Sequence, residues 1–535
     1  MTLPTRSELE ERAFGTSPIP RMVRTPFGAQ LLVDGRPFLS LGGELHNSSP
    51  SSPGFMVPIW DRLAQNRVGS IIGAASWQLV EPVEGTYDFS AVDSQITQAR
   101  DRGIRLILIW FASYKNAESS YAPSWVRRDE ERFPRATRDA ARAVTGRFRT
   151  DGPILSVFSD ELVAADARAF AALMRHLRHI DPDHTVIAMQ VQNEVGLLGD
   201  SRDRSPLADA AWEGDVPAEL LRGLAARGDD LQPWIRDLWR RHGSLENGTW
   251  ADVFGIDRDA EEVFMSWGFS NFIEKVASAG GAEHSLPMFT NAWLGPQPNA
   301  SIPGQYPSGG PVSRMIDVWQ IGAPSLDFLA PDIYIEDFEG ALATYDVAGN
   351  AIFVPEARPD PGLAFVAIGA YRAIGFHPFG IDAVLDHQDL FDAMSAIQDM
   401  TEVITDAQAD GRIHGFRLVT GEEDSVQLGG FTITISGPID SRGMFGAGTG
   451  EAAAELTGYG LIVQIAAEEF LVLARGISLN FTHEEGIVEL DELTEGNHVD
   501  GRWVPGRTLN GDERYWMFPK HGLSTVHIKL LRRSA

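Results

Sequence analysis

Short apolar runs alternate with longer amphipathic segments along residues 1–405. Alternation of this kind is typical of repeated βα units around a parallel sheet. The candidate strands are the runs Phe38–Leu45, Val68–Trp77, Ile104–Phe111, Thr185–Gln192, Pro287–Trp293, Leu326–Tyr334, Ala351–Glu356 and Ala373–Gly380. Eight such strands predict an α/β fold of the (β/α)8 TIM-barrel type, in which the active site lies at the C-terminal ends of the strands.

Further elements are expected around these strands. Residues Leu31–Phe38 contain an Asp-Gly turn, which predicts a β-hairpin leading into the first strand. A helix is expected over 160–180, with Asp160 as its N-cap. Residues Ala211–His242, rich in Trp, Leu and Arg, predict helices in a long connection after the fourth strand. Long connections of this kind tend to shape the active site of a barrel.

From residue 406 the pattern changes to short β-like runs separated by turn residues. The runs are Ser425–Ser436, Gly460–Ile465, Phe470–Ala474, Ile477–Phe481, Gly486–Leu493 and Ser524–Leu531. They predict an antiparallel β-sandwich. Two domains are therefore expected: residues 1–405 as the barrel with its N-terminal hairpin, and residues 406–535 as the β-sandwich.

Charge and hydropathy narrow the choice of partners. The formal charge of −29, from 45 basic and 74 acidic residues, argues against nucleic acid, whose phosphates require a basic face. It also disfavours strongly anionic polysaccharides, so a neutral partner fits better. No run of about 18 apolar residues occurs, and no membrane-spanning helix is expected. The sequence offers no test of self-association, so a homo-oligomer stays open.

Several kinds of chemistry are excluded or unsupported. The chain has no cysteine, which excludes disulfides, thiolate metal sites and a cysteine nucleophile. Glu44 and His46 lie close together, but no His-x-x-x-His pattern or carboxylate-rich cation loop accompanies them. We therefore expect neither a metal nor an organic cofactor. The N-terminus lacks the apolar core of a signal peptide, which predicts a cytoplasmic protein, or a periplasmic or secreted one if a signal has been removed.

Two glutamates each end an apolar run. Glu194 follows Val-Gln-Asn in the fourth run, and Glu356 follows Phe-Val-Pro in the seventh. In a parallel barrel both would project from the same rim. Cleavage of a glycosidic bond needs two such carboxyls, one to protonate the leaving oxygen and one to attack the anomeric carbon. The pair predicts a retaining glycoside hydrolase with its two carboxyls about 5–5.5 Å apart.

Each glutamate has an expected role. Glu194 is the candidate acid/base, and the amide of Asn193 is placed to bond the sugar 2-hydroxyl. Glu356 is the candidate nucleophile, kept ionised by Arg358 or by Tyr334. This division of roles requires the pKa of Glu194 to rise and that of Glu356 to fall. The alternatives are a solvated glutamate that starts a loop at Glu194, an amphipathic residue that caps the core at Tyr334, and a surface or helix-start residue at Arg358.

Four stretches carry a likeness to a known family. They are Leu41–His46, Trp77–Phe89 with its Trp-x-x-x-Glu-Pro and Gly-x-Tyr-x-Phe elements, Gln190–Gly196 around Asn-Glu, and Phe328–Tyr334 before the nucleophile strand. These stretches resemble glycoside hydrolase family 35, the β-galactosidases, in its bacterial branch with a modest β-sandwich tail. The likeness covers roughly residues 25–400 and implies catalysis by Glu194 and Glu356.

The chain departs from that family's pattern at two places. After the third strand the family typically has Ala-Glu-Trp, whose Glu holds a sugar hydroxyl. This chain reads Phe-Ala-Ser-Tyr-Lys-Asn there, so Lys115 and Asn116 are expected to take that place. Val195 replaces the usual Tyr after the acid/base. The preference for the axial 4-hydroxyl of galactose is thereby left open, whereas the catalytic pair is unaffected.

Aromatic side chains near strand ends are candidates for a sugar platform, because a pyranose presents a face of C–H bonds that packs on a ring. Trp293, just before a Pro- and Gly-rich loop, is the first candidate, and Trp77 is another. Burial in the core is the alternative for each ring. Glu44 is expected either to bind sugar hydroxyls or to accept a structural hydrogen bond.

Together these features predict a retaining exo-β-glycosidase, most specifically a β-galactosidase that releases terminal β-linked galactose by double displacement. Its partner would be a neutral β-linked oligosaccharide or polysaccharide, with no nucleic acid and no membrane involved. Another clan A β-glycosidase or an endo-glycanase shares the barrel and the two carboxyls, so the fold does not choose between them. A non-catalytic carbohydrate-binding protein is the alternative from a different class, and it predicts Glu194 and Glu356 far apart.

Overall fold

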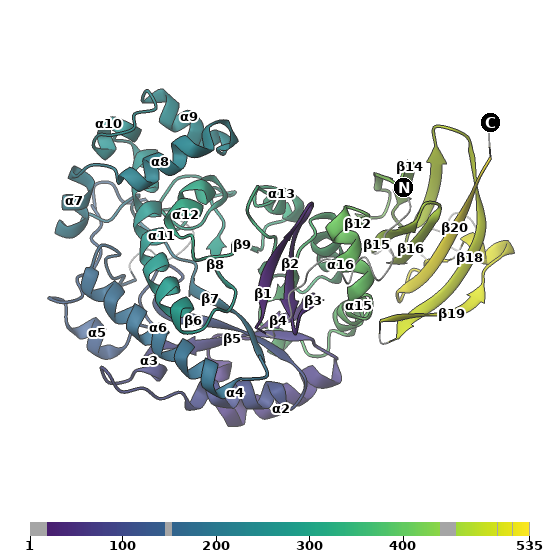
Figure 1. The fold of residues 1–535 in the computed structure, drawn as a ribbon, viewed down its shortest axis with the longest axis horizontal. Helices are drawn as coiled ribbons and strands as arrows, with labels where there is room; N and C mark the ends of the chain where they lie inside the picture. Colours follow the sequence, from purple (N-terminus) through teal and green to yellow (C-terminus); the bar gives the residue numbers. More distant parts are fainter. Residues whose placement is uncertain (1–18, 145–151, 439–455, 500, 516, 534–535) are drawn as a thin grey trace, which may run out of the picture.

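The computed structural model of this protein describes residues 19–144, 152–438, 456–499, 501–515 and 517–533. Its centre is a closed parallel barrel in which the strands pair in the order β10-β11-β4-β5-β6-β7-β8-β9 (Figure 1). The strands are β4 (Ser40–Glu44), β5 (Ser70–Ser76), β6 (Arg105–Lys115), β7 (Val186–Asn193), β8 (Met288–Trp293), β9 (Phe328–Ile333), β10 (Val354–Ala357) and β11 (Gly375–Pro378). Each overlaps one predicted run, so the predicted (β/α)8 barrel is confirmed.

Helices surround this barrel. They are α2 (Pro53–Gln65), α3 (Trp77–Val80), α4 (Ser90–Arg100), α5 (Ser124–Arg128), α6 (Asp160–Ile180), α11 (Arg258–Glu283), α12 (Ile316–Gly322), α13 (Phe338–Ala343), α14 (Pro361–Phe365), α15 (Gln388–Asp399) and α16 (Thr401–Asp410). The connection from β7 to α11 adds α7 (Pro206–Glu213), α8 (Ala218–Arg227), α9 (Pro233–Arg241) and α10 (Trp250–Phe254). Short turns of helix, mostly 3-10, lie at Ser49–Ser51, Gly228–Asp230, Ser313–Met315, Val366–Ala370, Ile381–Ala383 and Gly511–Tyr515. The helices expected within residues 211–242 are therefore present.

Local sequence explains where these elements begin and pack. The side chain of Ser159 accepts a hydrogen bond from the backbone N–H of Leu162, so Ser159 caps α6 and Asp160 is its first residue. The predicted cap was thus one residue late. In β4, a Cβ on Gly42 would come within 1.7 Å of the carbonyl oxygen of Ser70. Only glycine allows the two neighbouring strands to approach so closely.

An N-terminal antiparallel sheet covers one end of the barrel. It consists of β1 (Arg21–Thr25), β2 (Gly28–Val33) and β3 (Arg36–Phe38). The turn between β2 and β3 is Asp34-Gly35, and both residues have positive φ, as a two-residue hairpin turn requires. The predicted hairpin is therefore confirmed. Leu31 and Val33 pack with strand residues of the barrel, among them Ile107 and Phe289, in one apolar cluster.

Two antiparallel sheets form the C-terminal part, drawn in yellow-green to yellow in Figure 1. The larger sheet pairs β12 (Ile413–Val419), β15 (Thr457–Ala466), β16 (Glu469–Arg475), β20 (Ser524–Arg533), β18 (Ile487–Val499) and β19 (Arg502–Thr508) in that order. The smaller pairs β13 (Glu423–Leu428), β14 (Phe431–Ser436) and β17 (Ser478–His483). Apolar side chains of both sheets share one core, which agrees with the predicted β-sandwich. The strands β12 and β19 were not predicted. Strand β19 holds Pro and Gly and is largely exposed, so its sequence does not resemble a typical strand.

The larger C-terminal sheet packs directly against the barrel helices. The ring of Tyr459 in β15 stacks on that of Phe365 in α14, with centroids 5.3 Å apart. Arg417 pairs with Asp360 at 2.8 Å beside this contact. Such packing is consistent with a bracing role for the sheets. Helix α16 runs across residue 405, and the division of the chain at 405/406 stays a prediction. Among the described residues, no helix is long and apolar enough to cross a membrane.

Candidate active site

Five charged side chains gather at the C-terminal ends of the barrel strands. Glu44 ends β4, Lys115 ends β6, Glu194 follows β7, Asp332 lies near the end of β9, and Glu356 lies in β10. All five are buried, with Glu194 8 % exposed and Glu356 6 % exposed. Each of the four carboxyls has its ionisation influenced by others in the group or by Lys115. The barrel therefore brings the two predicted catalytic glutamates into one electrostatically coupled site.

The backbone around Glu194 is held in an unusual conformation. Glu194 has φ 46° and Gln192 has φ 64°, in the left-handed region that side chains other than Gly rarely adopt. The N–H of Glu194 donates to Oδ1 of Asn291 at 2.9 Å, and its carbonyl accepts from the N–H of Ala117 at 3.1 Å. Strain of this kind persists only where surrounding contacts over-determine it, and it concentrates at functional sites.

Glu356 is held through its side chain. The hydroxyl of Tyr334 donates to Oε2 of Glu356 at 2.8 Å, and Nδ2 of Asn291 lies 3.5 Å from Oε1. Tyr334 directly follows β9 and is 40 % exposed, so its ring is open to solvent while its hydroxyl reaches into the site. Hydrogen bonds donated to a carboxylate favour its ionised form. The hydroxyl of Tyr334 therefore contacts the carboxyl it was expected to contact, and its role in keeping Glu356 ionised stays a prediction.

Different neighbours shift the pKa values of the two glutamates. Burial, with the charge of Glu356 as the next cause, raises the pKa of Glu194 to about 8. Burial also raises the pKa of Glu356, against the opposing effects of Lys115 and the Tyr334 hydroxyl. The expected fall in the pKa of Glu356 is therefore wrong in direction, because desolvation of a buried carboxyl outweighs its favourable partners. The expected rise for Glu194 is present.

Buried polar atoms around the pair lack partners within the described part of the chain. Both carboxyl oxygens of Glu44, Nδ2 of Asn193 and Oδ1 of Asp332 make no hydrogen bond. Burial also raises the pKa of Glu44 and of Asp332 well above the usual range, with Glu356 as the next cause for each. Buried polar groups in proteins nearly always find a partner. These atoms can meet the hydroxyls of a bound sugar.

Other predicted residues also lie at this rim. Nζ of Lys115 donates to Oδ1 of Asn193 at 3.0 Å and to Oδ1 of its neighbour Asn116. Asn116 is exposed and has φ 51° in the turn after β6. Trp293 ends β8, is only partly buried, and pairs in register with Asp332. Its place at a strand end beside the site is consistent with the expected sugar platform.

The structure does not place Trp77 or Arg358 in the expected roles. Trp77 is 0 % exposed, because β5 ends at Ser76 and the chain turns into α3 with the indole pointing inward. Its Nε1 donates to Oε2 of Glu81 at 2.7 Å. A ring without exposed surface offers no platform for a sugar. Arg358 donates to the backbone carbonyl of Tyr334, so it supports Glu356 only through that residue.

Two further polar residues, Asn291 and Asp332, connect the strands that form the site, and the sequence indicates them less clearly than the two glutamates. Asn291 bonds the backbone of Glu194 and also donates to Oδ2 of Asp332 at 2.8 Å. Asp332 pairs in register with Glu356. Asp332 is absent from the site residues predicted from the sequence. Because side chains two apart share a strand face, its spacing from Tyr334 could have revealed it.

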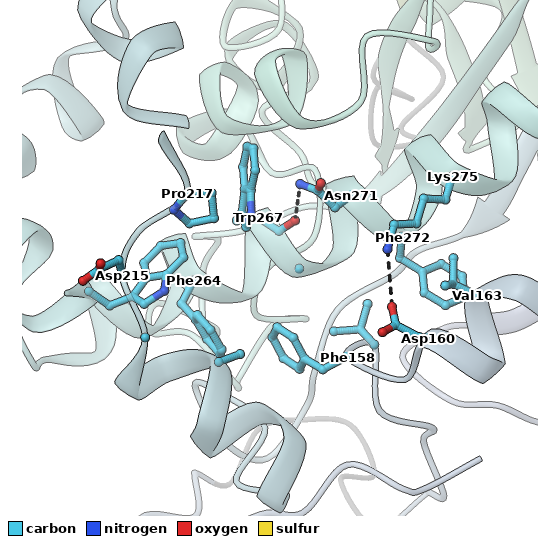
Figure 2. A pocket seen from close by; sticks show the side chains of 15 residues that line it. Phe158, Asp160, Val163, Asp215, Pro217, Phe264, Trp267, Asn271, Phe272 and Lys275 are labelled. Carbon is cyan, nitrogen blue, oxygen red and sulfur yellow. Dashed lines mark hydrogen bonds and ion pairs between the residues drawn. The ribbon is translucent and has the colours of Figure 1, made fainter. Parts of the chain in front are cut away.

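A cavity lies outside the barrel, between α6, α10 and α11 (Figure 2). Its volume of about 420 Å³ is in the range of small-molecule sites. Aromatic rings such as Trp267 and Phe158 line it, together with the ion pair of Lys275 and Asp160 at 3.6 Å. None of the predicted site residues lines it. Among the described residues no group of three or more His, Asp or Glu side chains is arranged to hold a metal.

Comparison with protein families gives two matches. Residues 62–254 match glycoside hydrolase family 42, described as β-galactosidase, and residues 393–519 match a domain of unknown function, DUF5597. The first segment contains β5, β6 and β7, and therefore Lys115, Asn193 and Glu194. The match therefore links the segment that carries Glu194 to the β-galactosidases, and the strand of Glu356 lies outside it. The finer resemblance to family 35 is not confirmed by the match.

Comparison with solved structures finds matches among β-galactosidases. That of the psychrophilic Marinomonas ef1 has 15 % identity and a TM-score of 0.44, covering 70 % of this chain and 61 % of its own. The enzyme of Bacillus circulans sp. alkalophilus has 14 % identity and a TM-score of 0.45, covering 69 % and 57 %. This chain thus spans less than two thirds of these proteins. At these values the likeness identifies no function. Comparison with curated proteins finds no match.

Proposed function

We propose that this protein is a retaining exo-β-glycosidase, most specifically a β-galactosidase acting on neutral β-linked oligosaccharides or polysaccharide side chains. The observation that carries the proposal is the meeting of Glu194 and Glu356 at one barrel rim, each with different partners. The likeness of residues 62–254 to the β-galactosidase family supports the choice of sugar, as does the family-35-like pattern of the sequence.

The proposed reaction proceeds by double displacement. A carboxylate oxygen of Glu356 attacks the anomeric carbon, the bond to the leaving oxygen breaks, and Glu194 donates its proton to that oxygen. A glycosyl ester on Glu356 results. Ionised Glu194 then takes a proton from water, the water oxygen attacks the anomeric carbon, and the ester bond to Glu356 breaks. The pKa of about 8 keeps Glu194 protonated at neutral pH for the first step.

The surroundings of the pair support recognition of a single terminal sugar. Glu44, Asn193 and Asp332 present unpartnered polar atoms from three strands, and all three side chains are buried. A sugar ring whose hydroxyls meet these atoms would be enclosed, as exo action requires. Trp293 and Tyr334 then supply aromatic surface at the edge.

The proposal is tested by hydrolysis of nitrophenyl β-D-galactoside beside the gluco, manno, fuco and α-galacto analogues. We expect the β-galactoside to be preferred, and Glu356→Ala to lose more than about 10⁴-fold in kcat, by comparison with removal of other nucleophiles. Added azide should restore turnover of the variant and give the α-glycosyl azide. Glu84→Ala, which removes an exposed glutamate paired with Arg132, should retain full activity.

The outcomes separate the alternatives. Preference for another β-glycoside, with azide rescue of Glu356→Ala intact, would support the retaining mechanism and change the proposed sugar specificity. Turnover of polymers alone would indicate an endo-glycanase. Binding of sugars without turnover of either kind of substrate would indicate a carbohydrate-binding protein and overturn the catalytic proposal.

A further inference from the structure

Lys115 is the one residue of the site whose charge is opposite to the rest, within the part of the chain that the structure describes. It ends β6, and its side chain is buried. The turn that follows is hydrogen-bonded to the backbone of Asn193 and Glu194. The N–H of Asn116 donates to the carbonyl of Asn193 at 3.2 Å, and that of Ala117 to the carbonyl of Glu194 at 3.1 Å. The ammonium therefore has a fixed place beside the catalytic pair.

Four carboxyls face this ammonium from separate strands. They are Glu44 of β4, Glu194 after β7, Asp332 of β9 and Glu356 of β10, and Lys115 lowers the pKa of each. Among the other titratable groups packed against these strands, burial raises the pKa of the Tyr334 phenol and of Asp166, which accepts hydrogen bonds from Ser113 and Gln192. Burial lowers the pKa of His377 in β11 to about 3. Four ionised carboxyls and one ammonium would leave an uncompensated negative charge in a buried site, which is costly. The site therefore holds protons on some of these carboxyls.

The hydrogen bonds of Lys115 also fix the direction of an amide. An ammonium group only donates, so its contact with Asn193 must be to the carbonyl oxygen, Oδ1. The Nδ2 group of Asn193 is then turned away from Lys115. It is buried and has no partner among the described residues. In this orientation Asn193 offers a donor, rather than an acceptor, to a substrate oxygen.

We propose that Lys115 is a positioning residue that acts on both groups: its charge keeps Glu356 ionised while neighbouring carboxyls carry protons, and its hydrogen bond presents Nδ2 of Asn193 to the substrate. The first effect gives the site a nucleophile, and the second gives it a directed donor next to the reacting carbon. This inference deepens the proposed glycosidase function and rests on it for the roles of Glu356 and Asn193.

The first test compares Lys115→Met, which keeps the length and removes the charge, with Lys115→Arg, which keeps the charge. In Lys115→Met we expect kcat to fall more than tenfold and the acidic limb of the kcat/KM profile to move up by about one pH unit, because a nearby cation lowers a carboxyl pKa by about that amount or more. In Lys115→Arg the limb should stay close to its original pH. Lys275→Met, the same change on the outer face of α11, should alter neither.

The second test does not depend on turnover. A carboxyl whose folded pKa lies above its unfolded value contributes stability that is present at low pH and lost as the pH rises through the folded pKa. Removing Lys115 raises these folded pKa values further. Parent and variant then differ in stability only above the parent's folded pKa, which is about 8 for Glu194. The thermal midpoint of Lys115→Met, relative to the parent protein, should therefore be lower at pH 9 than at pH 5. A purely structural role would give the same difference at both pH values.

The outcomes are distinguishable from failure of the proposed function. If the parent protein hydrolyses no glycoside, the proposed function fails, and the pH-dependent difference in thermal midpoint still tests the charge of Lys115. An unmoved acidic limb together with a constant difference in midpoint overturns the inference. A rise in KM alone, with kcat and the limb unchanged, also overturns it and makes Lys115 a simple sugar ligand.

Discussion

Glu194 and Glu356 are the same residue type at nearly the same depth, but they are held in different ways. Glu194 is fixed through its backbone, by Asn291 and Ala117, and its carboxyl lies beside that of Asp332. Glu356 lies in β10 and is fixed through its carboxyl, by the hydroxyl of Tyr334. Burial raises the pKa of both. The hydroxyl of Tyr334 then favours charge on Glu356, and that charge in turn favours a proton on Glu194.

The comparison shows that position on a strand does not assign a catalytic role. Two glutamates at one rim of a barrel are chemically equivalent until their neighbours distinguish them. Here the distinguishing neighbours are Tyr334, which directly follows β9, Asn291 of β8 and Lys115 of β6. Removing one of these neighbours should reduce the chemical difference between the two glutamates. Removing one glutamate should reveal the role of the other.

The largest effect in this comparison is expected for Glu194→Ala. With a substrate whose leaving group needs protonation, kcat/KM should fall about 10²–10⁴-fold, the usual contribution of a general acid. With a dinitrophenyl glycoside, whose leaving group departs without a proton, kcat/KM should fall much less. Azide should give the β-glycosyl azide, opposite to the product from Glu356→Ala. Equal losses for both substrates would contradict the role of Glu194 as the acid.

Tyr334→Phe removes the hydroxyl that bonds Glu356 and leaves the ring in place. We expect kcat to fall about 10–100-fold, since a hydrogen bond to a charged group contributes about 1.5–3 kcal/mol. The acidic limb of the pH profile should move upward, because the variant carboxylate has lost a donor. Tyr515→Phe, at an exposed tyrosine of the C-terminal part, serves as the control. An unchanged limb would show that Tyr334 does not govern the ionisation of Glu356.

The smallest effect concerns the alkaline limb of the parent protein. Glu194 must carry its proton to protonate the leaving oxygen, and the pKa of about 8 means that the proton is lost above that pH. The value of kcat/KM should therefore be about tenfold lower at pH 9 than at pH 7. The limb should disappear in Glu194→Gln assayed with a dinitrophenyl glycoside. A limb that persists in this variant would belong to another group.

Strand positions were predictable from the sequence, because buried parallel strands appear in it as apolar runs. Each of the eight predicted runs overlaps one barrel strand. The identity of Glu194 and Glu356 followed from their places at the ends of two such runs. The edges of elements were less well determined. Trp77 was expected to end a strand, but β5 ends one residue earlier and the indole turns into the core. One residue is enough to reverse the direction of a side chain.

The sequence by itself determined the barrel, the two sheets that follow it, and the pair of glutamates on its rim, since these depend on periodicity and on residue type at strand ends. Only the tertiary structure decided that Asp332 meets that pair, how Glu44 and Lys115 lie beside it, and which groups bond Glu194 and Glu356. The physical reason is that the pKa of a buried carboxyl depends on burial, charges and donors brought in from other strands. Those neighbours are distant along the chain, and closure of the barrel brings them together.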